Sequence, residues 1–136
     1  MTVYNAIQCL NCKDILWSKH RHDYIVCKCG SCMNDGGNEY RRGYVGQPEK
    51  DLSVTTNDPF EKVREYLHRY NRYSKSYVKL KDIPDEWLQN IIDYHIEVKN
   101  ICNNPGFQMY LTEKLYRAEN EIFVPEDSNY ELDYGG

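Results

Sequence analysis

The sequence lacks any long apolar run. No stretch approaches the ~18 consecutive apolar residues of a membrane-spanning helix, and 28% of the 136 residues are charged against 40% hydrophobic. The first residues also lack the basic start, apolar stretch and small-residue cleavage site of a secretory signal peptide. These absences exclude the membrane and secreted classes, so we expect a folded protein of the cytoplasm that makes no membrane contact.

Cysteine, in contrast, is abundant. Five of the six cysteines lie between Cys9 and Cys32. In a reducing compartment a dense cysteine cluster binds a metal more often than it forms disulfides. The sixth, Cys102, stands alone, and we interpret it as a spare thiol.

Composition divides the chain into three segments and predicts an α+β fold. Residues 1–46 hold most of the glycines and cysteines together with short runs of β-forming residues, which predict a small β-rich module. Residues 47–58 are polar, contain Pro48 and are typical of a linker. Residues 59–136 have helical periodicity, and we expect a compact three-helix module that ends in an acidic tail.

The three helices are predicted from capping signals and spacing. Asp58 and Pro59 supply an N-cap and a first-turn proline for a helix over residues 60–78. A second helix begins at the stretch DIPDEW, and a third occupies about residues 108–120. The side chains expected to face the core are Phe60, Val63, Leu67 and Tyr70, then Trp87, Leu88, Ile91, Tyr94, His95 and Val98, then Leu111, Leu115, Ala118 and Ile122.

Two short cysteine loops predict a zinc ribbon in the N-terminal module. Zinc takes four soft or borderline ligands in a tetrahedron, and two such loops joined by a β-hairpin supply them. The first loop is Cys9-Leu-Asn-Cys12, and the second uses two of the three thiols at Cys27, Cys29 and Cys32. A disulfide framework and a redox dithiol are the alternatives.

The stretch SKHRHDYIVCKCGSCMNDGGNEYRR, from Ser18 to Arg42, resembles the small zinc-ribbon proteins of tailed phages and their mostly Gram-positive hosts. Those proteins combine a CxxC loop with a KxRHD segment, a CxCG loop, a DGG turn and a YxRR ending. In that pattern the position of Cys32 is not a fixed cysteine. The resemblance therefore implies that the zinc ligands are Cys9, Cys12, Cys27 and Cys29, with Cys32 in reserve.

Charged residues lie on both sides of the second cysteine loop. Lys19, Arg21 and His22 precede it, and Arg41 and Arg42 follow the DGG turn. If the ribbon forms, these side chains converge on one side of it. There they either contact an anion or a partner, or they belong to solvated turns with no binding role. A hydrolytic site is the remaining alternative, with His20, His22, Asp23 and Asp35 as its candidate residues. Four thiolates close the coordination of zinc, however, and closed zinc does not activate water, so we expect no catalysis.

The first predicted helix carries a second candidate binding surface. Tyrosines recur along it every three or four residues beside arginines, so they form one stripe. Such a stripe is either the rim of the core or a docking face that stacks on bases, grips phosphates or anchors a protein. The residues of the stripe are Tyr66, Arg69, Tyr70, Arg72, Tyr73 and Tyr77.

The C-terminal segment has a resemblance of its own. The stretches YVKLKDIPDEWLQNIIDY and YLTEKLYRAENEIFVPED resemble a helical module of small phage proteins that has a DxxDxWLxN opening and a YxxExxYRxENxI ending. This resemblance implies a phage origin, and hence the cytoplasm of a bacterial host, but no particular chemistry.

Charge is distributed unevenly along the chain, whose net charge is -4. Residues 60–81 carry seven basic and two acidic side chains, whereas residues 82–136 carry three basic and twelve acidic ones. With this asymmetry the two segments can pair with each other, two copies can pair head to tail as a homo-oligomer, or the chain can present an anion-binding face beside an acidic one.

The sequence supports three functions in order of preference. The first is a non-enzymatic phage-type protein that blocks a host protein, or sequesters a small nucleotide-like anion, during host takeover or evasion of host defence. The second is a nucleic-acid-binding zinc-ribbon regulator, against which the acidic tail and a pI near 5.6 count. The third is a small metal-dependent hydrolase.

Overall fold

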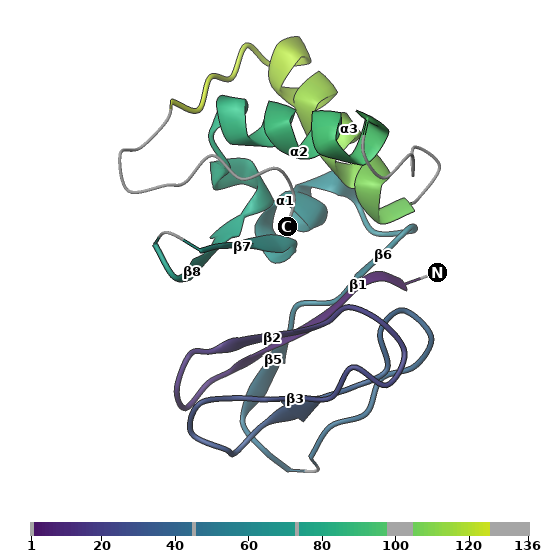
Figure 1. Cartoon of the computed structure of the whole chain (residues 1–136), viewed down its shortest axis with the longest axis vertical. Coiled ribbons are helices and arrows are strands. Elements are labelled where there is room, and N and C mark those ends of the chain that lie inside the picture. The colour runs from purple at the N-terminus through teal and green to yellow at the C-terminus, as the bar shows by residue number, and fades with distance from the viewer. Residues whose placement is uncertain (1, 45, 73, 98–104, 126–136) are drawn as a thin grey trace. The chain divides into compact units, whose positions relative to one another are not determined.

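The structure is a computed structural model whose described residues are 2–44, 46–72, 74–97 and 105–125. Its contacts divide the chain into two compact units, Met1–Lys62 and Val63–Gly136. The first unit is built mainly of strands and the second mainly of helices (Figure 1). The predicted α+β class, with N-terminal strands followed by three helices, is confirmed. Within the described ranges, no helix is long and apolar enough to cross a bilayer.

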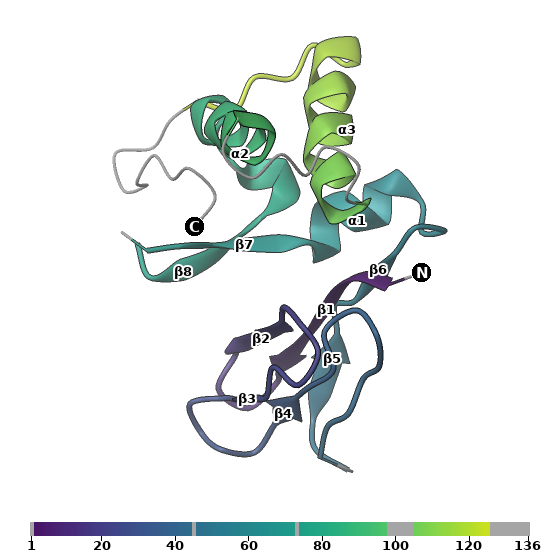
Figure 2. The same cartoon turned by 45° about the vertical axis from the view of Figure 1, so that its right-hand side comes forward.

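An antiparallel sheet is the frame of the first unit. Its central strand β1 pairs with β2 on one side and with β5 on the other, and its first residues pair with β6 (Figure 2). The β1 sequence TVYNAIQC is rich in residues that favour strands, and its Ala6 and Ile7 are fully buried. The four strands are β1 (Thr2–Cys9), β2 (Ile15–Ser18), β5 (Glu49–Asp51) and β6 (Val54–Thr55).

A second, smaller strand pair consists of β3 (Ile25–Val26) and β4 (Met33–Asn34). An isolated bridge between Asp35 and Arg42 continues the pairing beyond β4. The DGG turn lies between those two residues, and a Cβ atom added to Gly36 would lie 1.9 Å from the Tyr40 carbonyl oxygen. Only glycine fits this turn, because Gly36 also has a φ of +114°.

The segment 47–58 differs from the expected linker. Both β5 and β6 lie within it and pair with β1, and Leu52 and Val54 are buried. Two apolar residues separated by one polar residue are too short a pattern to reveal a strand in a polar segment. The pairing partner, which decides the conformation, is far away in the sequence.

The second unit combines a hairpin with helices. Its core contains the α2 side chains Trp87, Leu88, Ile91 and Ile92, all buried. The predicted second and third helices are present. The elements are α1 (Phe60–Tyr66), β7 (His68–Asn71), β8 (Ser76–Lys79), the short 3-10 helix η1 (Leu80–Asp82), α2 (Asp85–Glu97) and α3 (Pro105–Glu119).

The first helix is much shorter than predicted. It ends at Tyr66, and residues 68–79 form the antiparallel β7–β8 hairpin. Tyr70 and Tyr77 are therefore not on a helical stripe but opposite each other on neighbouring strands, with ring centroids 5.1 Å apart. The prediction was wrong because aromatic residues that recur every seven residues also meet across a hairpin of this length. Tyr73 lies outside the described residues.

The buried face of α3 also differs from the prediction. Leu115 is 62% exposed, whereas Glu113 and Arg117 are buried. Glu113 accepts hydrogen bonds from Nε of Arg64 and Nε of Arg117, both at 2.7 Å. Arg117 also donates to the Asp85 carboxylate at 2.7 Å and to the Leu80 carbonyl at 2.9 Å. A charged network therefore occupies the place expected for leucines.

Candidate metal centre

Four cysteine thiols of the first unit meet at one point. The Sγ atoms all lie within 4.8 Å of one another, and none of the described cysteines forms a disulfide. Two thiols come from the end of β1 and the turn after it, and two come from the loop after β3. The members of this thiol cluster are Cys9, Cys12, Cys27 and Cys29.

Hydrogen-bonded turns hold both cysteine loops. In the first, the amide of Lys13 donates to the Cys9 carbonyl at 2.8 Å, and Lys13 adopts a positive φ of 65°. In the second, the amide of Gly30 donates to the Cys27 carbonyl at 3.0 Å, with a φ of 78° at the glycine. Each turn folds the chain back so that two nearby thiols point to the same place.

Two of the sulfur separations match the edge of a tetrahedral metal site. Sγ of Cys29 lies 3.7 Å from Sγ of Cys9 and 3.5 Å from Sγ of Cys27. A tetrahedron with metal–sulfur bonds of about 2.3 Å has edges of about 3.8 Å, whereas a disulfide bond is about 2.05 Å long. The thiol cluster therefore has the spacing of a metal site, and its four soft donors suit a soft or borderline cation.

Polar groups around two of the four sulfurs favour the thiolate form that a metal requires. A hydrogen bond from the Ser31 hydroxyl is the largest of the effects that lower the pKa of Cys9, to about 5. The same hydroxyl, 2.9 Å from Sγ of Cys29, is the main cause of a lowered pKa there. Because thiolates are the form that binds metal, Ser31 prepares two of the four ligands.

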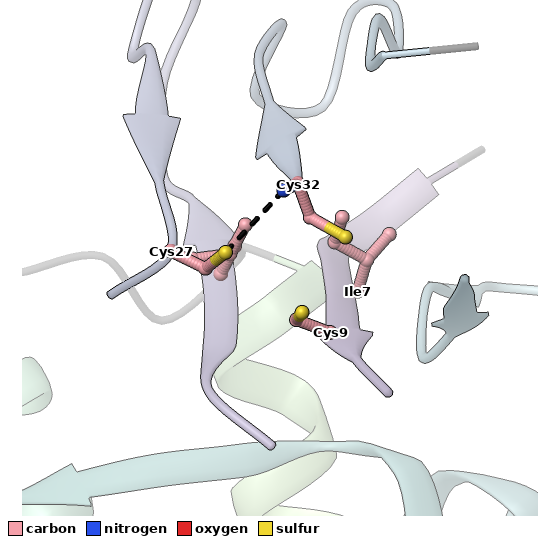
Figure 3. Close-up of a cluster of buried hydrophobic side chains, with 5 residues drawn as sticks. Ile7, Cys9, Cys27 and Cys32 are labelled. Carbon is pink, nitrogen blue, oxygen red and sulfur yellow. Dashed lines mark hydrogen bonds between the residues drawn. The ribbon is translucent and has the colours of Figure 1, made fainter. Parts of the chain in front are cut away.

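Cys32, the reserve ligand, stays outside the thiol cluster. Its side chain is fully buried, and burial raises the pKa of its thiol to about 11. Its Sγ lies 3.7 Å from the Pro48 carbonyl, and its backbone amide donates to Sγ of Cys27 at 3.3 Å (Figure 3). Cys32 therefore supports a ligand through its amide and fills the core beside Ile7.

Two of the basic residues predicted to contact an anion are held by carboxylates. Nη2 of Arg41 lies 2.9 Å from the Glu49 carboxylate, and Nη1 lies 3.7 Å from that of Asp51. Nη2 of Arg42 donates to Oδ2 of Asp35 at 2.9 Å. These contacts balance much of the positive charge on the two arginines.

The turn that contains Lys19, Arg21 and His22 meets the DGG turn. Nε of Arg21 lies 3.3 Å from the Glu39 carboxylate. The Tyr40 hydroxyl lies 3.0 Å from Nδ1 of His22. The structure thus brings together two turns that are separated by the whole second cysteine loop.

The residues of the hydrolytic alternative make hydrogen bonds and ion pairs within these turns. Oδ2 of Asp23 accepts a hydrogen bond from the Lys19 amide at 2.8 Å. Asp35 is 2% exposed and is bound by Arg42, while Nδ1 of His20 lies 3.1 Å from the Arg21 carbonyl. Each of these groups has a local partner that explains its position.

Two buried asparagines were not found by sequence reasoning. Nδ2 of Asn5 donates to the carbonyls of Gly37 at 2.8 Å and Tyr40 at 3.3 Å. Nδ2 of Asn34 donates to the carbonyls of Leu16 at 3.0 Å and Asn5 at 3.1 Å. They fix the DGG turn to β1 and β2, and nothing local in the sequence distinguishes them from surface asparagines.

The second candidate surface does not persist as one face. Arg69 is only 5% exposed, and its Nη1 donates to the Tyr110 hydroxyl at 3.3 Å. Tyr66 closes α1, Tyr70 is partly exposed on β7, and Arg72 is exposed in the turn after β7. The hairpin therefore separates these residues into buried and exposed groups.

One comparison with known proteins found a match. Residues 2–45 match a family model described as "Domain of unknown function (DUF7695)". The searches of curated proteins and of solved structures found no significant match. The matched residues contain the entire thiol cluster and both converging turns, so the candidate metal centre lies within a segment that is similar to this family of unknown function.

Proposed function

We propose that the chain is a non-enzymatic binding protein of phage type, in which a zinc ion held by the four thiolates stiffens the first unit. The observation that carries this proposal is the thiol cluster, whose four Sγ atoms lie within 4.8 Å of one another. Four cysteine ligands complete the tetrahedron of zinc and leave no position for a reactive water. Such an ion stabilises a fold and performs no chemistry.

The pairing of the basic residues favours a protein target. Arg21, Arg41 and Arg42 all lie beside carboxylates, and Arg69 is buried. A nucleotide or a nucleic acid needs cations whose charge is not already balanced, because phosphate contacts dominate such binding. We therefore propose that the protein blocks a host protein during host takeover or evasion of host defence.

The metal is tested by analysis of the full chain and two matched variants. We expect one zinc per chain, and Co²⁺ substitution with the absorption bands of tetrahedral thiolate coordination. Cys29→Ser removes a ligand and should abolish those bands, whereas Cys32→Ser should retain them. Loss of the bands in Cys32→Ser, or a bound metal with an exchangeable water, would overturn the closed site.

The target class is tested by affinity capture from a bacterial lysate at low and high salt. We expect one host protein to be retained at both salt concentrations. Recovery of nucleic acid alone, lost at high salt, would instead support the nucleic-acid regulator, since displaced counterions make such binding salt-dependent. Recovery of a nucleotide without a protein would favour sequestration of a small anion.

A further inference from the structure

Exposed aromatic side chains gather around the β3–β4 pair. Tyr24 is 51% exposed, Tyr44 is 41% exposed, and their hydroxyl oxygens lie 2.8 Å apart. Val26, which lies on β3 two residues after Tyr24, is 40% exposed. Ile25, the residue after Tyr24, pairs with Asn34, and the next residue, Asp35, forms a bridge with Arg42. We name the following group the tyrosine face: His22, Tyr24, Val26, Tyr40, Arg42 and Tyr44.

The six residues of the tyrosine face include no carboxylate, and the exposed Glu39 carboxylate beside Tyr40 pairs with Arg21. Asp35, which lies beneath it, is 2% exposed and is bound by Arg42 and by the Tyr40 hydroxyl, at 2.9 and 3.4 Å. The Arg42 side chain nevertheless remains 66% exposed. Because a guanidinium has five N–H donors and Asp35 receives only Nη2, the rest of the fork is available to a second carboxylate.

The DGG turn, which precedes Tyr40, Arg42 and Tyr44 in the chain, is held rigidly. Nδ2 of Asn5 donates a hydrogen bond to the Gly37 carbonyl, and Gly36 and Gly37 leave no room for side chains. Oδ1 of Asp35 is buried without a hydrogen-bond partner among the described residues. A buried acceptor left unpaired costs free energy, so the contacts of Oδ2 with Arg42 and the Tyr40 hydroxyl must offset the burial of this carboxylate.

We propose that the tyrosine face docks a protein segment that combines a carboxylate with apolar side chains. Tyrosine rings supply large contact areas at a low cost in side-chain entropy, and Tyr and Arg are enriched among the residues that dominate binding energy. The partner's carboxylate pairs with the free edge of Arg42, while its apolar side chains cover Val26 and the rings. A polyphosphate fits less well, because it needs several cations and Arg42 is the only arginine or lysine among the six residues of the tyrosine face. This inference rests on the proposed function and names its binding surface.

Two fluorescent peptides test the proposal with the zinc-loaded full chain. Both contain the same leucines, separated by aspartates in one peptide and by lysines in the other. Fluorescence anisotropy should show binding of the acidic peptide at least about tenfold tighter than that of the basic one. Tyr24→Ala and Tyr44→Ala should each weaken acidic-peptide binding about tenfold. Leu115→Ala, which removes an exposed side chain of the second unit, is the matched control and should change nothing.

The Co²⁺ absorption spectrum verifies that each variant retains its metal site. Equal binding of the two peptides, no binding of the acidic one, or undiminished binding by both tyrosine variants would overturn the proposal. So would preference for a single-stranded oligothymidylate that the same variants lose, because that result assigns the face to nucleic acid. If the Tyr24→Ala and Tyr44→Ala variants still capture the host protein from lysate, the proposed function stands and the tyrosine face alone is wrong.

Discussion

Glu113 is a buried charged residue at the centre of an ion-pair network in the second unit. It has no exposed surface, and it is the shared counter-ion of Arg64 and Arg117. The guanidinium of Arg64 also lies 4.4 Å from the centroid of the Tyr116 ring. A buried charge is tolerated only when it is paired and hydrogen-bonded, so each member of this network requires the others.

Substitution of Glu113 should be costly. Glu113→Gln retains the size of the side chain but leaves two largely buried arginines without their common carboxylate. We expect a loss of about 3–5 kcal/mol in the free energy of unfolding, because removal of one partner strands a buried charge. Urea denaturation followed by the fluorescence of buried Trp87, in a Trp17→Phe background, measures the loss.

Glu65→Gln is the matched control, since Glu65 pairs with Lys79 and Lys81 while remaining 43% exposed. Solvent screens this group, and the loss should be much smaller. The hydrogen bond from Lys81, followed by that from Lys79, lowers the pKa of Glu65 from 4.5 to about 2. Its contribution is therefore present above pH 4.5 and disappears as the pH falls towards about 2. Equal losses in the two variants at neutral pH would contradict the central role of Glu113.

At the scale of elements, features that the local sequence determines could be predicted, whereas features that depend on distant residues could not. The spacing of Cys9 and Cys12 is visible in the sequence because one turn determines it. The β7–β8 hairpin was missed because its tyrosine spacing also fits a helix. The β5 strand was missed because its pairing partner β1 is far away in the sequence. The charged face of α3 was missed for a related reason: Arg64, which makes Glu113 acceptable in the core, lies 49 residues away.

The DGG turn has no space for a side chain at Gly36. Gly36→Ala places a methyl group against the Tyr40 carbonyl at a φ of +114°. We expect the first unit to lose at least about 2 kcal/mol of stability, measured as a lower midpoint for the thermal loss of the Co²⁺ bands. Gly30→Ala is the comparison, because Gly30 has a φ of +78° but no atom within 4 Å of an added Cβ. Its cost should be about 1 kcal/mol, and a cost as large as that of Gly36→Ala would refute the steric argument.

At the scale of the whole molecule, the two units differ in what stabilises them. The buried cluster of the first unit includes the sulfurs of Cys9, Cys27 and Cys32. A unit of this size buries a small apolar core, and metal binding then contributes directly to folding. The second unit has Trp87 and Phe107 in its core, and the thiol cluster contains none of its residues.

Chelation should therefore affect the two units unequally. Addition of a strong chelator to the zinc-loaded full chain should greatly reduce the chemical-shift dispersion of the amide signals from residues 2–55. The amide signals from residues 85–97 and 105–119 should keep their dispersion. Two-dimensional ¹H–¹⁵N spectra before and after chelation measure this directly. Unchanged spectra would show that the ion is dispensable, and loss of both sets would show that the units fold as one.

The pairing of β5 and β6 with β1 matters for any attempt to isolate the first unit. A fragment that ends at residue 45, where the family match ends, lacks β5 and β6. One edge of β1 would then have unpaired backbone amides and carbonyls that can pair with neighbouring molecules. We therefore expect a stable fragment of the N-terminal half to extend at least through Thr55, where β6 ends.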